Sequence, residues 1–403
     1  MPHSTRIVLA AFSALSIVAC SASPEDLTRR ATGTAEGAVI KGTASDESQD
    51  AVVLVVSLGG SRGGIGSCTG TLLAPNLVLT ARHCVSDTEE GVACKSDGTP
   101  LAGGRVIRDK KASDLYIIKG VNRPTRPVAD GQGAKLIIND AKNLCNNDIA
   151  LLLLKEPIKD AQIAPVRLES PAVAGETITA VGWGVTDKTS SPDVRQQRAG
   201  IPVTGVGGDA REQTGPNEFR VGESICSGDS GGPGFAESTG AVLGVVSRGG
   251  NGQPPSRDPA ASCVGASASN IYTGVAGFKD LLLDAYAQAG QDPWYEGEGD
   301  PRLSKDGEAC SNATACRSGQ CIEGKCTASC AKKPCAEGFV CSDKAGGKVC
   351  TSTSPGAGPG DGSGTITTIT SCSAAPAPSS AGGSLALGLL VGAAILGARR
   401  RRD

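Results

Sequence analysis

The sequence Gly228-Asp229-Ser230-Gly231-Gly232-Pro233 places a serine within a glycine-rich turn, directly after an aspartate. A serine hydroxyl at its ordinary pKa is a weak nucleophile, so a catalytic serine needs an adjacent base that is oriented by a third group. It also needs N–H donors for the negative oxygen that forms when the serine attacks a carbonyl group. If Ser230 is a nucleophile, the rest of the chain must therefore supply a histidine, a carboxylate and suitable backbone N–H groups.

Two further segments supply candidates for these groups. The chain contains two histidines, and His3 lies in an N-terminal segment typical of an export signal, which leaves His83. His83 ends an apolar, strand-like segment, residues 68–83. Asp148 stands at the head of a wholly apolar run, residues 149–154, that must enter a core as a buried strand. A carboxylate in that position is rarely a simple surface residue, so Asp148 is the candidate for the group behind His83.

These segments resemble motifs of the chymotrypsin/trypsin family of serine proteases. The resemblance covers about residues 39–289 and rests on the family's order of histidine, aspartate and serine. Its motifs are Thr80-Ala81-Arg82-His83-Cys84, Asp148-Ile149-Ala150-Leu151-Leu152, Gly182-Trp183-Gly184 and Gly228-Asp229-Ser230-Gly231-Gly232-Pro233. It implies an all-β domain of two six-stranded antiparallel β-barrels, closed by a C-terminal helix for which residues 278–289 have the apolar spacing.

The resemblance also implies the chemistry of the site. The catalytic residues would be His83, Asp148 and Ser230, and the backbone N–H groups of Gly228 and Ser230 would form the oxyanion hole. The implied activity is that of a serine endopeptidase, which cleaves protein or peptide substrates through an acyl-enzyme and needs no metal or organic cofactor.

The implied specificity pocket differs from that of trypsin. Ser224 occupies the position, six residues before the nucleophile, where trypsin-like relatives carry an aspartate, and the bulkier Ile225 follows it. Asn270 replaces a glycine of the pocket wall, and Ser247-Arg248-Gly249 replaces the usual Ser-Trp-Gly. We therefore expect a small uncharged P1 residue such as Ala, Val or Thr. For Arg248 two hypotheses remain: it reaches into the cleft and favours acidic substrate groups, or it extends to solvent.

Asp229 predicts that the chain is made as a zymogen. A carboxylate buried beside the active site is costly unless it is paired. In the family the partner is an α-amino group freed by proteolysis, and Val39 aligns best with that new N-terminus. Cleavage after Ala38 is therefore expected, by the chain itself or by another protease, with Ile40 as the weaker alternative. Lys41 departs from the family's usual Ile-Val-Gly-Gly start.

Sixteen cysteines in one chain indicate disulfides and an oxidising compartment. The resemblance implies bridges from Cys68 to Cys84 and from Cys226 to Cys263, which leaves Cys94 to pair with Cys145. A second even set lies within residues 306–351, where apolar residues are too few for a core. This module would bind substrate or cell wall, or act as a protease-resistant spacer. Its cysteines are Cys310, Cys316, Cys321, Cys326, Cys330, Cys335, Cys341 and Cys350.

The N-terminus predicts export. Residues 1–22 have the charged and apolar regions of a signal peptide. Ile17-Val18-Ala19-Cys20 resembles a bacterial lipobox, so cleavage is expected either before a lipidated Cys20 or near Ala22. Residues 23–38 would then be a propeptide or tether.

The C-terminus predicts sorting to the surface. Residues 381–398 form an uncharged Gly/Ala/Leu-rich run followed by Arg399-Arg400-Arg401-Arg402. Such a run is nearly long enough to span a bilayer, and the arginines match a cytoplasmic flank. Together with Ser371-Cys372-Ser373 it resembles the C-terminal sorting signal of myxobacterial exported proteins. We expect a bacterial protein at the cell surface or outer membrane, or secreted after processing of a transmembrane tail at 381–403.

Composition limits the remaining hypotheses. With 56 Gly, 23 Pro and 3% aromatic residues, the 403-residue chain is not expected to form one large core. Residues 290–305 are predicted to be a linker and residues 352–380 a Gly/Ser/Pro stalk. A net charge of -2 gives no reason to expect nucleic-acid binding. Two alternatives to the peptidase are a catalytically silent binding protein on the same fold and a surface protein whose main role lies in the Cys-rich module.

Overall fold

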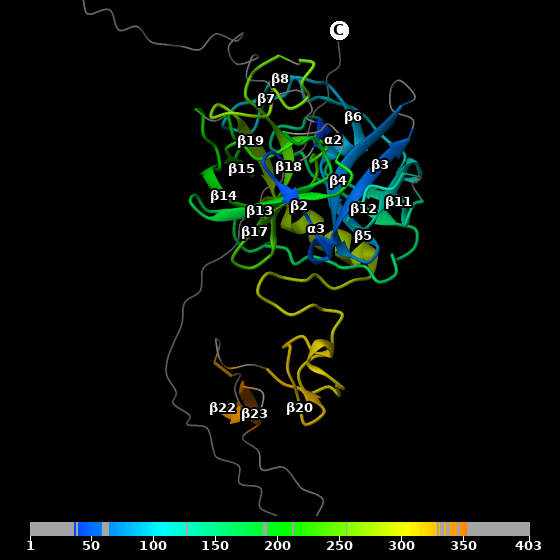
Figure 1. The fold of residues 1–403 in the computed structure, drawn as a ribbon, viewed down its shortest axis with the longest axis vertical. Helices are drawn as coiled ribbons and strands as arrows, with labels where there is room; N and C mark the ends of the chain where they lie inside the picture. The colour runs from blue at the N-terminus through cyan, green and yellow to red at the C-terminus, as the bar shows by residue number, and fades with distance from the viewer. Residues whose placement is uncertain are drawn as a thin grey trace, which may run out of the picture. The chain divides into compact units, whose positions relative to one another are not determined.

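β-Branched and aliphatic runs of the chain form strands that close into two barrels (Figure 1). The computed structural model describes residues 36–37, 39–58, 64–125, 128–187, 192–211, 213–254, 256–328, 330, 334–335, 339–344 and 347–352. The predicted signal peptide with its lipobox at Cys20, most of the propeptide, the stalk and the sorting tail lie outside these residues. Within the described part of the chain, no helix is long and apolar enough to cross a membrane.

The first barrel is a closed antiparallel sheet of six strands in the order β10-β11-β12-β5-β4-β3. Its wall bears Asp148 at one end of β12. The strands are β3 (Val52–Leu58), β4 (Ile65–Ala74), β5 (Leu77–Thr80), β10 (Leu115–Ile118), β11 (Gly131–Ile137) and β12 (Ala150–Leu154).

Strand β12 shows why the residues after Asp148 are all apolar. Ala150, Leu152 and Leu154 belong to the core cluster of the first barrel. Ile149 and Leu151 belong to a second cluster, which also contains residues of the second barrel and of the C-terminal helix. Because side chains alternate between the two faces of a strand and both faces are buried, neither face tolerates polar residues.

The second barrel closes in the order β13-β17-β18-β19-β15-β14, with an additional pairing of β13 with β14. The two closed six-stranded antiparallel barrels are therefore confirmed. β2 (Thr43–Ala44) extends the second sheet beyond β14. The barrel strands are β13 (Thr177–Gly182), β14 (Gln196–Val206), β15 (Glu218–Val221), β17 (Pro233–Ala236), β18 (Val242–Gly250) and β19 (Ser269–Gly274).

Short elements connect and decorate the barrels. The helical segments are η1 (Glu47–Gln49), α2 (Arg82–Val85), η2 (Ala112–Asp114), η3 (Val275–Phe278) and η4 (Ala313–Ala315). The short strands pair as β1 (Glu36–Gly37) with β16 (Cys226–Ser227), β6 (Ser86–Thr88) with β9 (Val106–Asp109), and β7 (Ala93–Cys94) with β8 (Pro100–Ala102).

The predicted C-terminal helix is α3 (Lys279–Ala289). Its buried residues Leu282, Ala285 and Tyr286 join the cluster that also contains residues of both barrels. Gly290 ends the helix with a φ of 67°, a left-handed conformation that glycine adopts without steric penalty. The helix thus stabilises the junction of the two barrels.

The segment after α3, expected to be a linker, makes ordered contacts with the barrels. Val166 N donates to Trp294 O over 2.8 Å, and Glu296 N donates to Val166 O over 3.1 Å. Arg167 also pairs with Glu296 over 2.7 Å. Trp294 and Tyr295 pack against the apolar clusters of the barrels. The polar, Gly/Pro-containing composition concealed these two aromatic anchors.

The Cys-rich region contains two consecutive four-cysteine units with the same connectivity. In each unit the first cysteine pairs with the third and the second with the fourth. The bridges are Cys310–Cys321 and Cys316–Cys326, then Cys330–Cys341 and Cys335–Cys350. Short hairpins accompany them: β20 (Cys321–Ile322) with β21 (Lys325–Cys326), and β22 (Phe339–Lys344) with β23 (Gly347–Ser352).

Candidate active site

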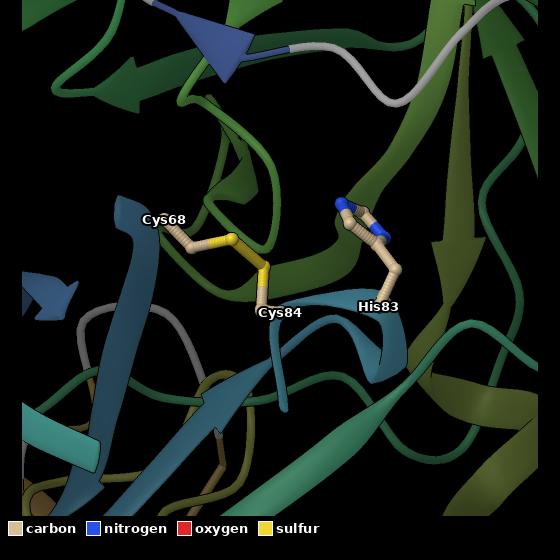
Figure 2. Close-up of side chains that lie close together, drawn as sticks. All are labelled: Cys68, His83 and Cys84. Carbon is tan, nitrogen blue, oxygen red and sulfur yellow. A yellow bond between two sulfur atoms is a disulfide. The ribbon is translucent and has the colours of Figure 1, made fainter. Parts of the chain in front are cut away.

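His83 lies on α2, the single helical turn that follows β5. The next residue, Cys84, is joined to Cys68 of β4, and Figure 2 shows this disulfide beside the imidazole ring. The two sulfurs and an imidazole nitrogen lie within 4.8 Å of one another. Because the sulfurs are already bonded to each other, they are not thiolates, which a metal would require. The bridge instead fixes α2 to β4.

Asp148 is held behind His83 by three hydrogen bonds. His83 Nδ1 lies 2.8 Å from Asp148 Oδ2, and the backbone N–H of His83 donates to Asp148 Oδ1 over 3.0 Å. Ser247 Oγ, from β18 of the second barrel, donates to Asp148 Oδ2 over 2.7 Å. The orientation of the ring therefore depends on residues of both barrels. His83 Nε2 is buried and has no hydrogen-bond partner among the described residues.

The Asp148 carboxyl group is almost completely buried, with 1% of its surface exposed. Burial alone would raise its pKa. The charge of His83 and the hydrogen bonds from His83 and Ser247 outweigh burial and hold the pKa of Asp148 below its usual value. An ionised Asp148 can stabilise an imidazolium at His83.

The nucleophile turn packs directly on the first barrel. Thr69 of β4 donates its hydroxyl to Gly228 O over 2.8 Å, and its backbone N–H donates to Ser230 O over 2.8 Å. Gly231 has a φ of 77°, and a Cβ on it would lie 2.1 Å from Thr80 Oγ1. Only glycine meets both conditions. The motif thus brings Ser230 against the end of β5, from which α2 and His83 continue.

A cleft of about 500 Å³ is lined by His83 and Ser230 together. Its other walls come from β3, β4 and the β6/β9 hairpin, and include the ion-paired Asp87 and Arg108. The cleft therefore gives a substrate access to the side chains that the sequence predicted to act together.

Asp229 is buried beside this turn without a cationic partner among the described residues. Its Oδ2 accepts the Cys226 N–H over 3.1 Å, whereas its Oδ1 is buried and has no hydrogen-bond partner in the described part of the chain. Burial raises the pKa of Asp229 well above its usual value, although the N–H groups of Cys226 and Gly184 oppose the shift. The carboxyl group lies against Gly182, where a Cβ would come within 1.9 Å of Oδ1.

Val39 and Ile40 are both fully buried. Val39 belongs to the core cluster of the second barrel, and Ile40 to a smaller apolar cluster next to it. Ile40 N donates to Ser224 O over 2.8 Å. Just before them, Gly37 of β1 pairs with Cys226, the residue whose N–H contacts Asp229. The segment predicted to provide the new N-terminus therefore runs alongside the strand that leads to Asp229.

Three of the predicted pocket residues lie together. Ser224 and Asn270 are buried, and Asn270 Nδ2 lies 3.3 Å from Ser224 Oγ and donates to Gly222 O over 2.8 Å. Asn270 is paired with Gly249 across β18 and β19, and a Cβ on Gly249 would lie 1.9 Å from Asn270 Oδ1. That oxygen is buried and has no hydrogen-bond partner within the described ranges.

The other three predicted pocket residues face elsewhere. Ile225 packs in the core cluster of the second barrel, where its β-branched side chain adds to the apolar core. Ser247 faces Asp148, as described above. Arg248 follows neither of its two hypotheses: it is 4% exposed and pairs with Glu218 of β15 over 2.7 Å. A buried guanidinium requires such a partner, and Glu218 supplies it.

The three bridges implied for the barrel domain are present in the structure. They are Cys68–Cys84, Cys94–Cys145 and Cys226–Cys263. Sequence reasoning missed two polar residues of the site, Thr69 and Glu218. For Glu218 a signal existed, because an arginine in place of a tryptophan next to Ser247 calls for a carboxylate nearby in the fold.

Comparison with known proteins agrees with this geometry. The family model described as Trypsin matches residues 39–280. A trypsin of Saccharopolyspora erythraea is 24% identical over 226 residues, which cover 54% of this chain and 86% of that protein. Trypsin 5G1 of Aedes aegypti is 28% identical over 56% of this chain and 78% of its own length. Beta-fibrinogenase mucrofibrase-1 of Protobothrops mucrosquamatus is 30% identical over 48% of this chain and 71% of its own length. With a family model that spans more than half of its residues, the chain belongs to the trypsin family of serine proteases.

Proposed function

We propose that the protein is an exported serine endopeptidase, made as a zymogen, that prefers small uncharged P1 residues. Membership of the family supports a peptidase acting on protein or peptide substrates. The observation that carries the catalytic assignment is the contact of His83 with the buried Asp148, together with the cleft that His83 and Ser230 line.

The catalytic cycle follows from these positions. Ser230 Oγ attacks the scissile carbonyl carbon while His83 Nε2 accepts the hydroxyl proton, and Asp148 stabilises the resulting imidazolium through Nδ1. The imidazolium returns that proton to the leaving nitrogen, the C–N bond breaks, and the acyl group remains as an ester on Ser230. A water molecule, deprotonated by Nε2, then cleaves the ester, and the proton returns to Ser230 Oγ.

Gly228 and Ser230 are assigned to the oxyanion hole. Gly228 has a φ of 98°, which an L-residue rarely adopts. The hydroxyl of Thr69 donates to the Gly228 carbonyl group over 2.8 Å. An anchored carbonyl limits rotation of the turn, so the donors need little reorganisation when the oxyanion forms.

The preference for a small uncharged P1 residue is supported by the pocket. Its buried residue at the usual position of the carboxylate is Ser224, which carries no charge for Lys or Arg. The Asn270 side chain reaches Gly249 on the opposite strand and occupies volume that a long P1 side chain would need. Cleavage profiling with a peptide library tests this: predominant cleavage after Lys or Arg would refute the pocket assignment.

Latency of the uncleaved chain is supported at two places. Asp229 is buried with no cation beside it in the described residues, and β1 pairs with Cys226 and Ser227, immediately before Gly228. Cleavage after Ala38 would release this strand and create an α-ammonium group at Val39, the group that in the family pairs with the aspartate at the position of Asp229. N-terminal sequencing of the active form is expected to begin at Val39; activity in a chain that still contains residues 23–38 would contradict the zymogen.

The experiment that tests catalysis is labelling with a fluorophosphonate, which reacts with activated serines. The processed chain is expected to be labelled, and Ser230→Ala to abolish both labelling and peptide cleavage. Ser113→Ala, which alters an exposed serine of η2, is the matched control and should change neither. A folded, processed chain that takes no label would instead support a catalytically silent binding protein.

Export and sorting remain proposals that rest on the two ends of the sequence. Fractionation of the producing bacterium should find the chain outside the cytoplasm. Incorporation of a fatty-acid analogue that is lost in Cys20→Ser would establish the N-terminal lipid. Mass spectrometry of the mature C-terminus would show whether residues 381–403 are removed. A cytoplasmic chain with an intact N-terminus would refute export.

A further inference from the structure

A buried ion pair lies directly behind the Asp148 side of the site. Arg248 of β18 and Glu218 of β15 are 4% and 3% exposed. They bind in a bidentate manner, with Arg248 Nη1 2.7 Å from Glu218 Oε1 and Nη2 2.7 Å from Oε2. The catalytic cycle described above does not use either residue.

Three backbone groups also form hydrogen bonds with the pair. Glu218 Oε1 accepts the N–H of Asn146 over 2.9 Å, and Oε2 accepts the N–H of Gly215 over 2.8 Å. Arg248 Nη2 donates to Gln213 O over 3.2 Å. Even a well-made buried ion pair is often no more stabilising than apolar residues of the same volume. Its presence here therefore suggests a role other than stability.

Two routes connect the pair to Asp148. On the first, Arg248 Nη1 lies 3.5 Å from Ser247 Oγ, whose hydroxyl donates to Asp148 Oδ2. A shift in the β18–β19 register between Val246 and Arg248 marks an irregularity at Ser247, which turns this hydroxyl away from the regular ladder.

On the second route, Glu218 holds the loop of the first barrel that carries Asp148. Asn146, two residues before Asp148, has a φ of 63°, an uncommon conformation for a residue other than glycine. Glu218 accepts the backbone N–H of Asn146. The side-chain oxygen of Asn146 accepts the N–H of Asn217 over 2.6 Å. Asn217 and Glu218, at the start of β15, therefore hold both the side chain and the backbone N–H of Asn146.

We propose that Arg248 and Glu218 are positioning residues that hold Asp148 behind His83 across the junction of the two barrels. The proposal rests on the peptidase activity proposed above. The family's usual Ser-Trp-Gly has a tryptophan, and therefore no guanidinium, at the position of Arg248. The charged groups that meet around Asp148 are His83 of α2 and Arg248 of β18, and Glu218 of β15 faces Arg248.

The test is the double substitution Arg248→Met/Glu218→Gln in the full chain. Methionine keeps the apolar length of arginine, and the glutamine oxygen can still accept the N–H of Asn146. Because a misplacement of about 1 Å can cost about a hundredfold in rate, we expect kcat to fall by about tenfold to a hundredfold while KM changes little. The acidic limb of the kcat/KM profile against pH should also move.

A second measurement does not depend on activity. The chain has only two histidines, so the deshielded Nδ1 proton between His83 and Asp148 can be followed by proton NMR without overlap from many others. We expect this signal to broaden or disappear in the double variant. The matched control is Arg195→Met/Asp50→Asn, which removes another buried arginine and its partner but touches no residue of the site. It should lower the melting temperature while leaving kcat and the NMR signal unchanged.

Three outcomes would overturn the proposal. One is an unchanged kcat and NMR signal in a folded double variant, which would make the pair purely structural. Another is a rise in KM alone, which would assign the pair to substrate binding.

If the double variant does not fold, Arg248→Lys replaces it: the ammonium keeps the charge but not the bidentate geometry. That variant should show a smaller loss of kcat, and full activity would refute the proposal. A wild-type chain that shows the NMR signal but cleaves no peptide would refute the peptidase, not the positioning role.

Discussion

Replacing Asp229 by asparagine is expected to stabilise the uncleaved chain and to destabilise the chain cleaved after Ala38. In the uncleaved chain the carboxyl group is 1% exposed, accepts the Cys226 N–H at Oδ2, and has no partner for Oδ1 among the residues that the structure describes. Its pKa is raised well above the ordinary 3.8 because burial penalises the charged form. Asparagine has the same shape and no charge.

The magnitude follows from these contacts. An unsatisfied buried polar group costs about 1–3 kcal/mol, and a charged one costs more. Asparagine keeps a polar group at this place but removes the charge, so we expect it to stabilise the uncleaved chain by about 1–2 kcal/mol at neutral pH. After cleavage the α-ammonium group of Val39 would pair with Asp229. Removing one partner of a buried ion pair then costs about 3–5 kcal/mol. The substitution should therefore change the sign of its effect on the free energy of unfolding.

The pH dependence has a defined sign. The folded, uncleaved chain holds the Asp229 proton to a higher pH than the unfolded chain does. Its stability should therefore fall as pH rises from the ordinary value of 3.8 through the raised pKa of the folded state. Asp229→Asn should remove this part of the slope.

The assay is urea unfolding of both forms in a Ser230→Ala background, which prevents self-cleavage. A recognition site for an added protease, placed within residues 34–38, makes the cleavage controllable. Equal destabilisation of the cleaved and uncleaved forms would refute the change of partner at Asp229, and with it the activation mechanism.

Three further predictions follow from individual contacts. Ser224→Asp combined with Asn270→Gly should raise kcat/KM for substrates with Lys or Arg at P1, because it supplies a carboxylate and removes the side chain that reaches Gly249. Cleavage of a peptide library measures this preference. An unchanged cleavage profile would show that the pocket lies elsewhere. Thr69→Val removes the hydroxyl that holds the Gly228 carbonyl group, and it should lower kcat by about tenfold or more with little change in KM. An effect on KM alone would contradict the proposal that Thr69 supports the oxyanion hole. Gly182→Ala places a Cβ 1.9 Å from Asp229 Oδ1 and should lower stability by about 1–3 kcal/mol in thermal unfolding, and a neutral result would mean that the Asp229 side chain can move aside.

The elements that the sequence predicted are those whose local pattern is sufficient. The run after Asp148 is apolar on both faces of one strand, so a buried strand was the only consistent structure. Helix α3 was predicted from its apolar spacing and ends at a glycine. The order of His83, Asp148 and Ser230 is a family pattern; in the fold His83 and Ser230 line one cleft, and Asp148 is buried against His83.

The elements that it missed depend on partners far apart in the chain. Glu218 and Arg248 are 30 residues apart, and neither residue by itself indicates a buried ion pair. Trp294 and Tyr295 lie in a segment whose polar neighbours are typical of a linker, yet the two rings find apolar surface on the barrels. Tertiary contacts of this kind have no period in the sequence.

The geometry of the proposed catalytic site is set where the two barrels meet, because each barrel supplies only part of it. His83 and Asp148 come from the first barrel, whereas Ser230 and Ser247 come from the second. Thr69 of the first barrel fixes the nucleophile turn of the second, and Glu218 of the second barrel fixes the Asp148 loop of the first. The two ties run in opposite directions across one junction. A relative displacement of the barrels would therefore disturb both ties and separate Ser230 from His83, even with each barrel intact. This explains why buried polar residues lie at the junction, where apolar packing alone would hold the barrels together without fixing their register.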